Sequence, residues 1–304
     1  MNGILNVYKP EGITSFSAVA RVKKFTGEKR IGHAGTLDPL ATGVLPLLIG
    51  KAACMQEMLS NHDKTYIAGV RLGTTTDTGD ITGKTLSENN TEISDQAFFE
   101  VLSSFVGKQK QVPPMYSAIQ IYGKRLYELA RQGIEVERQS RDIEIYSAKV
   151  ICRENKTDFK IEVSCSKGTY IRTLCEDIGK TLGVGACMYS LERTVCGQFE
   201  KKDSVSLSQL EEYFKNGQTE KIEEKLISPE CIFGNLKKIY LPEFYSKLCI
   251  NGCEIYTKKA RIDEKLFEND AMCRIYTNDK RFIGTGELRD FPDGKAIKIK
   301  YRFI

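Results

Sequence analysis

Residues 32–46 read GHAGTLDPLATGVLP and set a single carboxylate, Asp38, inside a segment punctuated by glycines. Pro39 disfavours helical backbone at the residue before it, so Asp38 is expected in extended or turn backbone. The glycines on either side allow close backbone approach or positive φ angles. The apolar run VLPLLIG (44–50) then has the length of a buried strand. The stretch therefore predicts a loop that carries one acid and leads into a core strand.

The surroundings of Asp38 narrow its possible roles. A phosphate-binding loop is disfavoured because the pattern G-x-x-x-x-G-K-[ST] is absent and a central acid would repel the ligand. A metal site is disfavoured because a hard cation needs several oxygen ligands. Two interpretations remain open: an Asx-turn in which Asp38 bonds only to the backbone, or a carboxylate that acts alone as nucleophile or base.

The composition indicates a cytoplasmic protein without a metal or cofactor. The chain has 304 residues, of which 41% are apolar, enough for one or two domains with a real core. It contains no apolar run of about 18 residues, which excludes a transmembrane helix, and its start lacks the features of a signal peptide. The ten cysteines form no C-x-x-C pair, and no histidine lies near Cys249 and Cys253 to complete a zinc site.

The net charge of +5 is unevenly spread along the chain. Residues 9–51 carry seven Lys and Arg against three acids, and residues 110–141 carry six against three. Local basic surface beside a near-neutral remainder is typical of a protein that binds a polyanion, although ordinary solvated lysines give the same pattern.

The hydrophobic pattern predicts a mixed α+β core followed by a small β-barrel. A strand ends at Pro10, and a helix capped by Thr14 or Ser15 and stopped by Gly27 follows. The apolar face of this helix is expected to hold Phe16, Val19, Val22 and Phe25. Strands are expected at 64–73, 141–151 and 191–199, and in the segment 158–174, which turns into a helix through residues 171–182. Further helices are expected at 51–60, 95–106 and 126–132, and a loop at 74–83. A weak boundary lies near 228, after which short strands dominate.

Seven motifs in order resemble the TruB family, the bacterial tRNA pseudouridine synthases that isomerise uridine 55 in the T-loop. They are NVYKP (6–10), GHAGTLDPLATGVLP (32–46), KTY (64–66), GTTTDTGD (73–80), PPMYSAIQIYGKRLYELAR (113–131), SKGTYIRTL (166–174) and LERT (191–194). The resemblance covers nearly all of the first 200 residues. It implies an α+β pseudouridine synthase core with a mixed, largely antiparallel sheet over residues 1–228, and a PUA-like RNA-binding β-barrel over residues 229–304.

The resemblance also implies roles for individual side chains. Asp38 would be the catalytic residue, paired with Arg172, and Tyr66 would stack on a flipped uracil. Tyr170 and Leu191 would line the uracil pocket, and Lys9 would support the loop. Taken alone, Arg172 reads as a surface arginine, and Tyr66, Tyr170 and Leu191 read as core residues.

The resemblance implies tRNA, through its T-stem-loop, as the partner of a monomer that uses no cofactor, guide RNA or membrane. Residues 113–142 would form a thumb that closes over the RNA. The side chains expected to contact RNA are His33, Lys64, Lys124, Arg125, Arg131, Arg138 and Arg141; phosphate contacts of this kind fix register rather than read sequence. On residue type alone, His33 reads as a polar loop residue and the thumb as a solvated hairpin.

Three other functions remain open at this point. The chain could be a non-catalytic RNA-binding or tRNA-folding protein, which the basic segments also fit. It could be a guide-RNA-dependent pseudouridine synthase, although that class predicts a larger C-terminal domain or basic tails. It could be a nucleoside glycosidase, but that chemistry usually needs a second acid as proton donor, and the motif shows none.

Overall fold

The structure is a computed structural model, and it describes residues 1–121, 123–267 and 271–304. Among these residues, eleven strands form one large sheet. Its strands are β1 (Gly3–Lys9), β2 (Ile31–His33), β3 (Thr42–Ile49), β4 (Lys64–Leu72), β7 (Gly107–Gln111), β10 (Arg141–Arg153), β11 (Asp158–Cys165), β12 (Ala186–Cys196), β13 (Phe199–Glu200), β14 (Val205–Ser206) and β15 (Leu226–Ile227). The main path runs β14-β1-β3-β12-β4-β11-β10-β7.

The sheet is mixed and largely antiparallel, as predicted. Among the described pairs of this large sheet, only β1–β14 and β3–β12 are parallel. The β3–β12 pair is short and joins Thr42 to Glu192 and Gly43 to Arg193. Gly43 has φ 106°, and a Cβ there would lie 2.2 Å from the carbonyl oxygen of Arg193. Glycine is therefore required where β3 meets β12, directly after the segment that carries Asp38.

Helix α1 (Ser15–Thr26) begins and ends where the sequence predicts. The Thr14 hydroxyl caps it by accepting from the backbone N–H of Ser17, and Gly27 ends it in left-handed backbone. Its buried face packs Ala18, Val19, Val22 and Phe25 into the main core. The expectation that Phe16 belongs to this face is wrong, because its side chain is 74% exposed and buried Ser15 takes its place.

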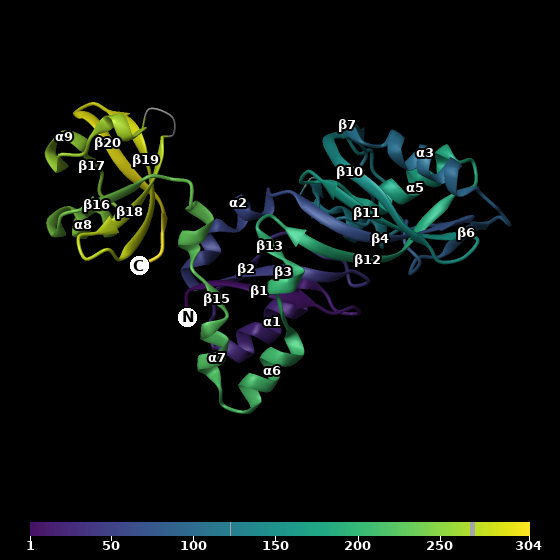
Figure 1. Cartoon of the computed structure of the whole chain (residues 1–304), viewed down its shortest axis with the longest axis horizontal. Coiled ribbons are helices and arrows are strands. Elements are labelled where there is room, and N and C mark those ends of the chain that lie inside the picture. Colours follow the sequence, from purple (N-terminus) through teal and green to yellow (C-terminus); the bar gives the residue numbers. More distant parts are fainter. Residues whose placement is uncertain (122, 268–270) are drawn as a thin grey trace.

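Four further helices pack around the large sheet. They are α3 (Asp95–Ser104), α5 (Ile171–Thr181), α6 (Leu207–Lys215) and α7 (Thr219–Glu224), together with short segments η1 (Gly50–Met55), α2 (Gln56–Ser60) and η2 (Lys201–Asp203). Figure 1 shows α1, α6 and α7 grouped below one half of the sheet, with α3 and α5 at its other half. The longest helix in the described part of the chain, α1, has 12 residues, and none there is long and apolar enough to cross a membrane.

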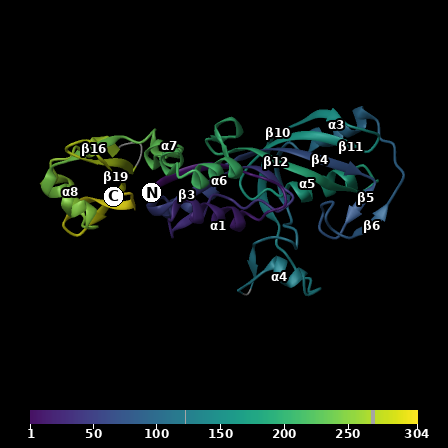
Figure 2. The ribbon, with the colours of Figure 1, turned by 90° about the horizontal axis from the view of Figure 1, so that it is seen from below.

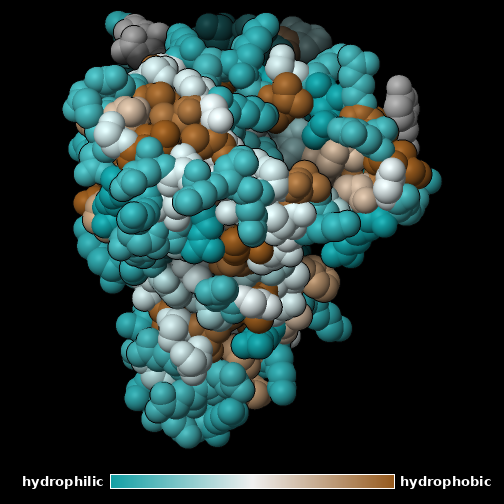
Figure 3. All heavy atoms as spheres, turned by 90° about the vertical axis from the view of Figure 1, so that its right-hand side faces the viewer, coloured by the Kyte–Doolittle hydropathy of each residue, from teal (hydrophilic) through white to brown (hydrophobic). Residues whose placement is uncertain are grey.

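The region 74–83 is not the simple loop that its turn residues suggest. It begins with strand β5 (Thr74–Thr76), which pairs with β6 (Thr85–Glu88) in a separate ribbon. This ribbon and α3 lie at one end of the molecule. The face seen in Figure 3 is mostly hydrophilic with separate hydrophobic patches, and Leu86 of β6 and Phe99 of α3 are among the exposed apolar side chains of the chain.

The predicted thumb is a projection between β7 and β10. Its elements are β8 (Gln120–Ile121), β9 (Lys124–Arg125) and α4 (Leu126–Ala130), and Figure 2 shows α4 standing away from the sheet. Its buried side chains include Leu126 and Leu129, so the projection has only a small core of its own. Arg141 and Asp142 belong to β10 instead. We call residues 112–140 the thumb.

The C-terminal residues form a separate curled sheet with the order β16-β18-β19-β20-β17. Its elements are η3 (Pro229–Phe233), β16 (Lys238–Leu241), α8 (Glu243–Ile250), β17 (Ile255–Tyr256), α9 (Thr257–Ala260), η4 (Glu264–Phe267), β18 (Met272–Thr277), β19 (Phe282–Phe291) and β20 (Gly294–Arg302). The sheet is a half-barrel, and α8 is a helix that the strand-rich pattern did not predict. The α+β fold with a curled C-terminal sheet is therefore confirmed.

The C-terminal sheet is joined to the main body by a hydrophobic cluster. Phe233 and Phe303 pack there with Ile4 of β1 and Met55 of η1, and all four are buried. The chain just before the C-terminal sheet is also paired to the large sheet, because β15 (Leu226–Ile227) lies antiparallel to β1. The domain boundary at 228 stays a prediction, and the packing on both sides of it is shared.

Candidate active site

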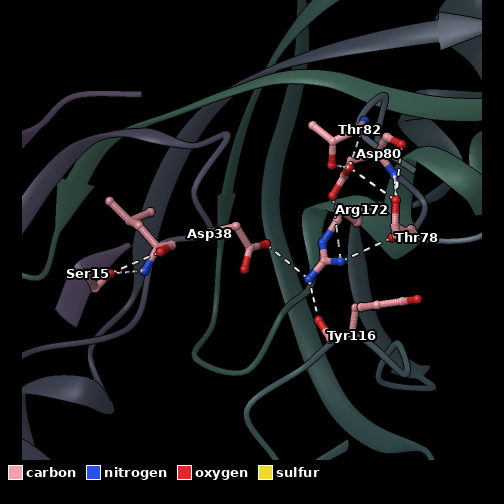
Figure 4. A network of polar contacts seen from close by, with 8 residues as sticks. Ser15, Asp38, Thr78, Asp80, Thr82, Tyr116 and Arg172 are labelled. Carbon is pink, nitrogen blue, oxygen red and sulfur yellow. Dashed lines mark hydrogen bonds and ion pairs between the residues drawn. The ribbon is translucent and has the colours of Figure 1, made fainter. Parts of the chain in front are cut away.

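Asp38 lies in residues 34–41, which connect β2 to β3 and which we call the Asp38 loop. Its side chain is 39% exposed, and its Oδ2 lies 3.0 Å from Nη2 of Arg172. Figure 4 shows the two side chains pointing toward each other across a gap between distant parts of the chain. The backbone carbonyl of Asp38 accepts from the N–H of Ala41 in a turn. The carboxylate thus faces an arginine and stays open to solvent, which the Asx-turn interpretation does not describe.

Arg172 lies in the first turn of α5 and is buried, so the reading as a surface arginine is wrong. Besides Asp38, its guanidinium donates to the carbonyl of Thr78 at 3.1 Å and to that of Tyr116 at 2.7 Å. The start of α5 is itself anchored by Gln111, whose side chain exchanges two hydrogen bonds with the backbone of Tyr170. A planar fork with fixed donors holds its orientation better than a single ammonium group.

A second carboxylate, Asp80, lies on the other side of the same guanidinium. Its Oδ2 is 3.8 Å from Nη1 of Arg172. Its Oδ1 accepts from the Thr78 hydroxyl at 3.1 Å and from the backbone N–H and hydroxyl of Thr82 at 3.0 and 2.5 Å. Asp80 is buried, its Oδ1 acts as a hydrogen-bond acceptor, and its side chain lies beside Arg172 (Figure 4). The sequence reading missed this residue, although it quoted the motif GTTTDTGD that ends with it.

Lys9 contacts the backbone of the Asp38 loop through its ammonium group. It is fully buried at the end of β1, and its ammonium donates to the carbonyls of Pro10 at 2.8 Å, Ile13 at 2.7 Å and Pro39 at 3.4 Å. Burial lowers the pKa of Lys9 to about 8, with Asp38 and Glu11 acting in the opposite direction. Lys9 therefore ties the residue that follows Asp38 to strand β1.

Arg193 in β12 is the second buried cation behind the loop, and the sequence reading missed it. It is fully buried, and it donates to the carbonyls of Val44 at 2.8 Å and Gly35 at 3.0 Å. These two bonds hold both ends of the Asp38 loop. The motif LERT contains this residue as well as Leu191, but residue type alone does not indicate a buried position, because arginines are rarely fully buried.

Tyr66, Tyr170 and Leu191 surround this part of the sheet. Tyr66 of β4 lies opposite Arg193 in the sheet register and belongs to the main core. Burial raises its pKa to about 12, so its hydroxyl is neutral at pH 7. Tyr170 stands half-buried at the N-cap of α5, and Leu191 of β12 is half-buried against the same core. The burial of Tyr66 matches the interpretation as a core tyrosine for the protein without RNA.

His33 directly precedes the Asp38 loop, and the side chain of Lys64 lies beside the loop at Gly35. His33 ends strand β2 rather than sitting in a loop, and its buried Nδ1 has no hydrogen-bond partner among the described residues. Burial lowers the pKa of His33, and Arg193 acts in the same direction. Lys64 is buried, and its ammonium donates to the carbonyls of Ser60 and His62. The prediction that Lys64 contacts RNA does not fit this buried position, where two of its three donors bind backbone carbonyls at the end of α2.

The basic side chains predicted to contact RNA from the thumb differ in their exposure and in their contacts within the protein. Lys124, Arg125 and Arg131 are exposed, and both arginines lie over the ring of Tyr127. Arg138 is half-buried and donates to Glu135 and to the carbonyl of Pro113. Arg141 is exposed at the start of β10. Three predicted contacts therefore lie on the projecting part of the thumb, and two lie at its base.

Three buried cations with no acid partner lie around the site. Among the described ion pairs, none joins Lys9, Lys64 or Arg193 to a carboxylate, and all three bind backbone carbonyls instead. Their uncompensated charge favours a negatively charged ligand at the Asp38 loop. The described side chains bring together no group of three or more His, Cys, Asp or Glu with metal-binding geometry.

Comparison with protein families gives two consecutive matches. Residues 23–171 match the N-terminal domain of the TruB family pseudouridylate synthases, and residues 172–240 match the C-terminal domain of tRNA pseudouridylate synthase B. A protein of Clostridium tetani named tRNA pseudouridine synthase B is 44% identical over 94% of this chain and 96% of that protein. Its namesake in Clostridium acetobutylicum is 43% identical over 98% of this chain and 99% of that protein.

Solved structures show the same fold at lower identity. The crystal structure of a Cbf5-Nop10-Gar1 complex contains a chain with TM-score 0.70 and 24% identity, covering 99% of this chain and 85% of that one. A chain in an H/ACA RNP bound to a substrate RNA gives TM-score 0.69 at the same identity and coverage. At this low identity the solved structures show only that the fold is the same, whereas the full-length relatives show the family. On the strength of those relatives and of the two matched domains, the chain belongs to the TruB family of pseudouridylate synthases.

Proposed function

We propose that this protein isomerises uridine 55 in the T-loop of tRNA to pseudouridine. The full-length relatives named tRNA pseudouridine synthase B support tRNA as the substrate. The observation that carries the proposal is the ion pair between Asp38 and Arg172, in which an exposed carboxylate is held by a buried arginine that also donates to two backbone carbonyls. Such an arrangement presents one carboxyl group to a ligand and keeps its direction fixed.

The reaction suits a single carboxylate. It breaks the bond between C1′ of the ribose and N1 of uracil, turns the base, and forms a bond from C1′ to C5, and the proton on C5 passes to N1. No electrons are gained or lost by the substrate. Asp38 assists the departure of the base by attacking C1′, by adding to C6, or by removing a ribose proton, and the three routes remain open.

The base has to leave the RNA stack before Asp38 reaches it. We assign His33 to the loop of RNA from which the base departs, and Tyr66 to the face of the flipped uracil, where stacking contributes roughly 1–3 kcal/mol. Tyr170 and Leu191 complete the walls of the uracil pocket. Because Tyr66 is buried in the protein alone, this assignment requires the pocket around it to open when the base enters.

The exposed thumb residues Lys124, Arg125 and Arg131 would bind RNA phosphates, and the C-terminal half-barrel would extend the RNA-binding surface. We propose that the protein acts on tRNA as a monomer and without a guide RNA. A folded RNA loop is recognised mainly by shape and by a few exposed bases, so phosphate contacts would set the register.

A nucleoside glycosidase is less well supported, although the site does contain a second acid. Asp80 accepts hydrogen bonds from Thr78 and Thr82 and faces Arg172, so its oxygens act as acceptors. A glycosidase of the two-carboxylate type needs a protonated acid that donates to the leaving group. A non-catalytic RNA-binding role would leave the exposed, oriented carboxylate of Asp38 without a purpose.

The test is incubation of the purified protein with unmodified tRNA transcripts, followed by mapping of pseudouridine along the RNA. We expect modification at position 55 without added guide RNA, and none there in a transcript with cytidine at that position. Modification at a different position would overturn the assignment of uridine 55. Binding without any modification would leave the non-catalytic function.

A further inference from the structure

Ser15 joins α1 to the Asp38 loop through one hydroxyl group. Its side chain is buried at the first residue of α1. The hydroxyl donates to the carbonyl of Leu37 at 3.0 Å and accepts from the N–H of the same residue at 2.8 Å. A serine hydroxyl rotates freely and both donates and accepts, so it pairs with both backbone groups of Leu37 as a neighbouring strand would.

Ser15 is free to make these bonds because another residue caps the helix. The N-cap is Thr14, whose hydroxyl accepts from the N–H of Ser17 at 3.0 Å. Leu37 is buried and lies outside the strands of the sheet, so its backbone groups have no ladder partner. A buried, unpaired peptide group is costly, and the Ser15 hydroxyl satisfies both of its polar atoms.

The backbone on the other side of Asp38 is held just as firmly. The carbonyl of Pro39 accepts from the N–H of Gly12 at 2.8 Å and from the ammonium of Lys9 at 3.4 Å. Asp38 therefore stands between two anchored residues, and its carboxylate reaches Arg172 at 3.0 Å. Because an aspartate side chain is short, the direction of the carboxylate follows from the backbone that precedes and follows it. Figure 4 shows Ser15 on the side of Asp38 that faces away from Arg172.

We propose that Ser15 is a positioning residue for the isomerisation: its hydroxyl fixes the backbone of Leu37 so that Asp38 faces Arg172 and the reacting sugar before RNA binds. This inference rests on the proposed function. Ser15 is buried and acts through the loop, without touching the substrate. When the hydroxyl is removed, the peptide of Leu37 loses both partners, and Asp38 samples directions in which it cannot react.

The test compares Ser15→Ala with Thr14→Ala. Both changes remove one hydroxyl from the start of α1, but only Ser15→Ala frees the Asp38 loop. In single-turnover reactions with saturating enzyme, we expect Ser15→Ala to be slower by about tenfold to a hundredfold, as is usual for a displaced reacting group. Its affinity for tRNA should change by less than about threefold, because binding rests on a broad surface. Thr14→Ala should lower the melting temperature and leave the rate within about twofold.

A second measurement follows the contact itself. Hydrogen exchange at the Leu37 amide should accelerate in Ser15→Ala and stay slow in Thr14→Ala, since only the former loses the acceptor of that N–H. If Ser15→Ala does not fold, Ser15→Cys keeps the connectivity of the side chain with a larger sulfur atom and replaces the hydroxyl by a weak donor and acceptor, and the same loss of rate is expected from it. Equal single-turnover rates in the Ser15 and Thr14 variants, with an active wild-type protein, would overturn the role of Ser15. An inactive wild-type protein would overturn the proposed function itself.

Discussion

The Asp38 loop and the thumb differ in their secondary structure and in how far their side chains and backbone are held by buried contacts. The loop has no regular secondary structure, yet Ser15, Lys9 and Arg193 hold its backbone from three elements. The thumb has strands and a helix, yet its basic side chains Lys124 and Arg131 stand exposed. In these two regions, the number of buried hydrogen bonds to the backbone therefore does not follow the amount of regular secondary structure.

The two regions meet at one guanidinium group. Arg172 binds Asp38 through Nη2, and the same nitrogen donates to the carbonyl of Tyr116 at the base of the thumb. Under the proposed function, the loop would hold the reacting group in place, and the thumb would contribute charge for capture of the RNA. Changes in the loop should therefore affect the chemical step, and changes in the thumb should affect binding.

The largest expected effect comes from Asp38→Asn. Asparagine keeps the size of the side chain but removes the negative charge and the nucleophile, so pseudouridine formation should become undetectable. The affinity for tRNA should stay within about threefold of wild type, because many contacts share it. Pseudouridine mapping and a binding titration measure the two quantities separately.

Asparagine can return to aspartate by deamidation, so mass spectrometry of the Asp38→Asn protein is the control. Substantial turnover by a protein shown to be intact asparagine would falsify the catalytic assignment of Asp38. A large loss of tRNA affinity would instead show that the Asp38 loop contributes to RNA binding, contrary to the expected difference between the loop and the thumb.

The next largest effects are expected from the partners of Asp38. Arg172→Lys keeps a positive charge but cannot bind Asp38 and the carbonyls of Thr78 and Tyr116 together, so the single-turnover rate should fall about a hundredfold. Asp80→Asn keeps the shape but weakens the pull on Arg172 from the other side, and a smaller loss of rate is expected. Asp77→Asn is the matched control, since Asp77 is exposed in the same turn and its carboxylate accepts from the N–H of Lys84. Equal rates in the Asp80 and Asp77 variants would show that Asp80 does not orient Arg172.

Local patterns in the sequence predicted the elements that local chemistry determines. Helix α1 begins after Thr14 and ends at Gly27 because a side-chain cap and a left-handed glycine act within one turn. The position of Asp38 in a loop before a core strand followed from its proline neighbour and the apolar run after it. The face of α1 was harder to predict, because Phe16 fits the helical period and is nevertheless exposed.

The support of the site depends on contacts between distant segments, and no local pattern reveals these. Asp80 looks like a turn residue until the fold brings it to Arg172. Arg193 and Lys64 carry charge, which predicts exposure, yet each is buried because backbone carbonyls of loops and helix ends surround it. The family resemblance supplied Arg172 and Tyr66, which residue type alone would have assigned to the surface and the core.

A smaller effect, on binding alone, is expected from the thumb. Replacing Lys124, Arg125 and Arg131 together by glutamine should weaken tRNA binding at low salt. It should also flatten the dependence of affinity on salt, because about three fewer phosphates are neutralised. The rate at saturating enzyme should change little. Binding titrations at several salt concentrations measure both the affinity and its dependence on salt.

The control for the thumb is a triple change of Lys215, Lys221 and Lys225 to glutamine, in and after α6 and α7. It removes the same charge from helices that lie apart from α4 of the thumb (Figure 2). Equal losses of affinity and slope in the two proteins would mean that net charge, rather than the thumb, attracts the RNA. A lower single-turnover rate at saturating enzyme in the thumb variant would show that the thumb also affects the chemical step.

The smallest expected effect concerns pH and Lys9. Burial lowers the pKa of Lys9 from 10.5 to about 8, so its ammonium loses a proton in mildly alkaline solution. A neutral amine has two N–H groups, and the carbonyls of Pro10, Ile13 and Pro39 then compete for them. The Asp38 loop should loosen, and the single-turnover rate of the wild-type protein should fall as the pH rises through about 8.

Lys9→Met provides the comparison, because methionine is also long and unbranched but has no proton to lose. Its rate should be lower at pH 7 and should show no step near pH 8, so that the two proteins converge at higher pH. Stability should move the opposite way: between about pH 8 and 10.5 the unfolded chain binds more protons at Lys9 than the native protein does. The wild type should therefore gain unfolding free energy relative to Lys9→Met as the pH rises. Loss of rate alongside a gain in stability would show that Lys9 serves the position of the loop at a cost to the fold. A step near pH 8 of the same size in both proteins would assign it to another group.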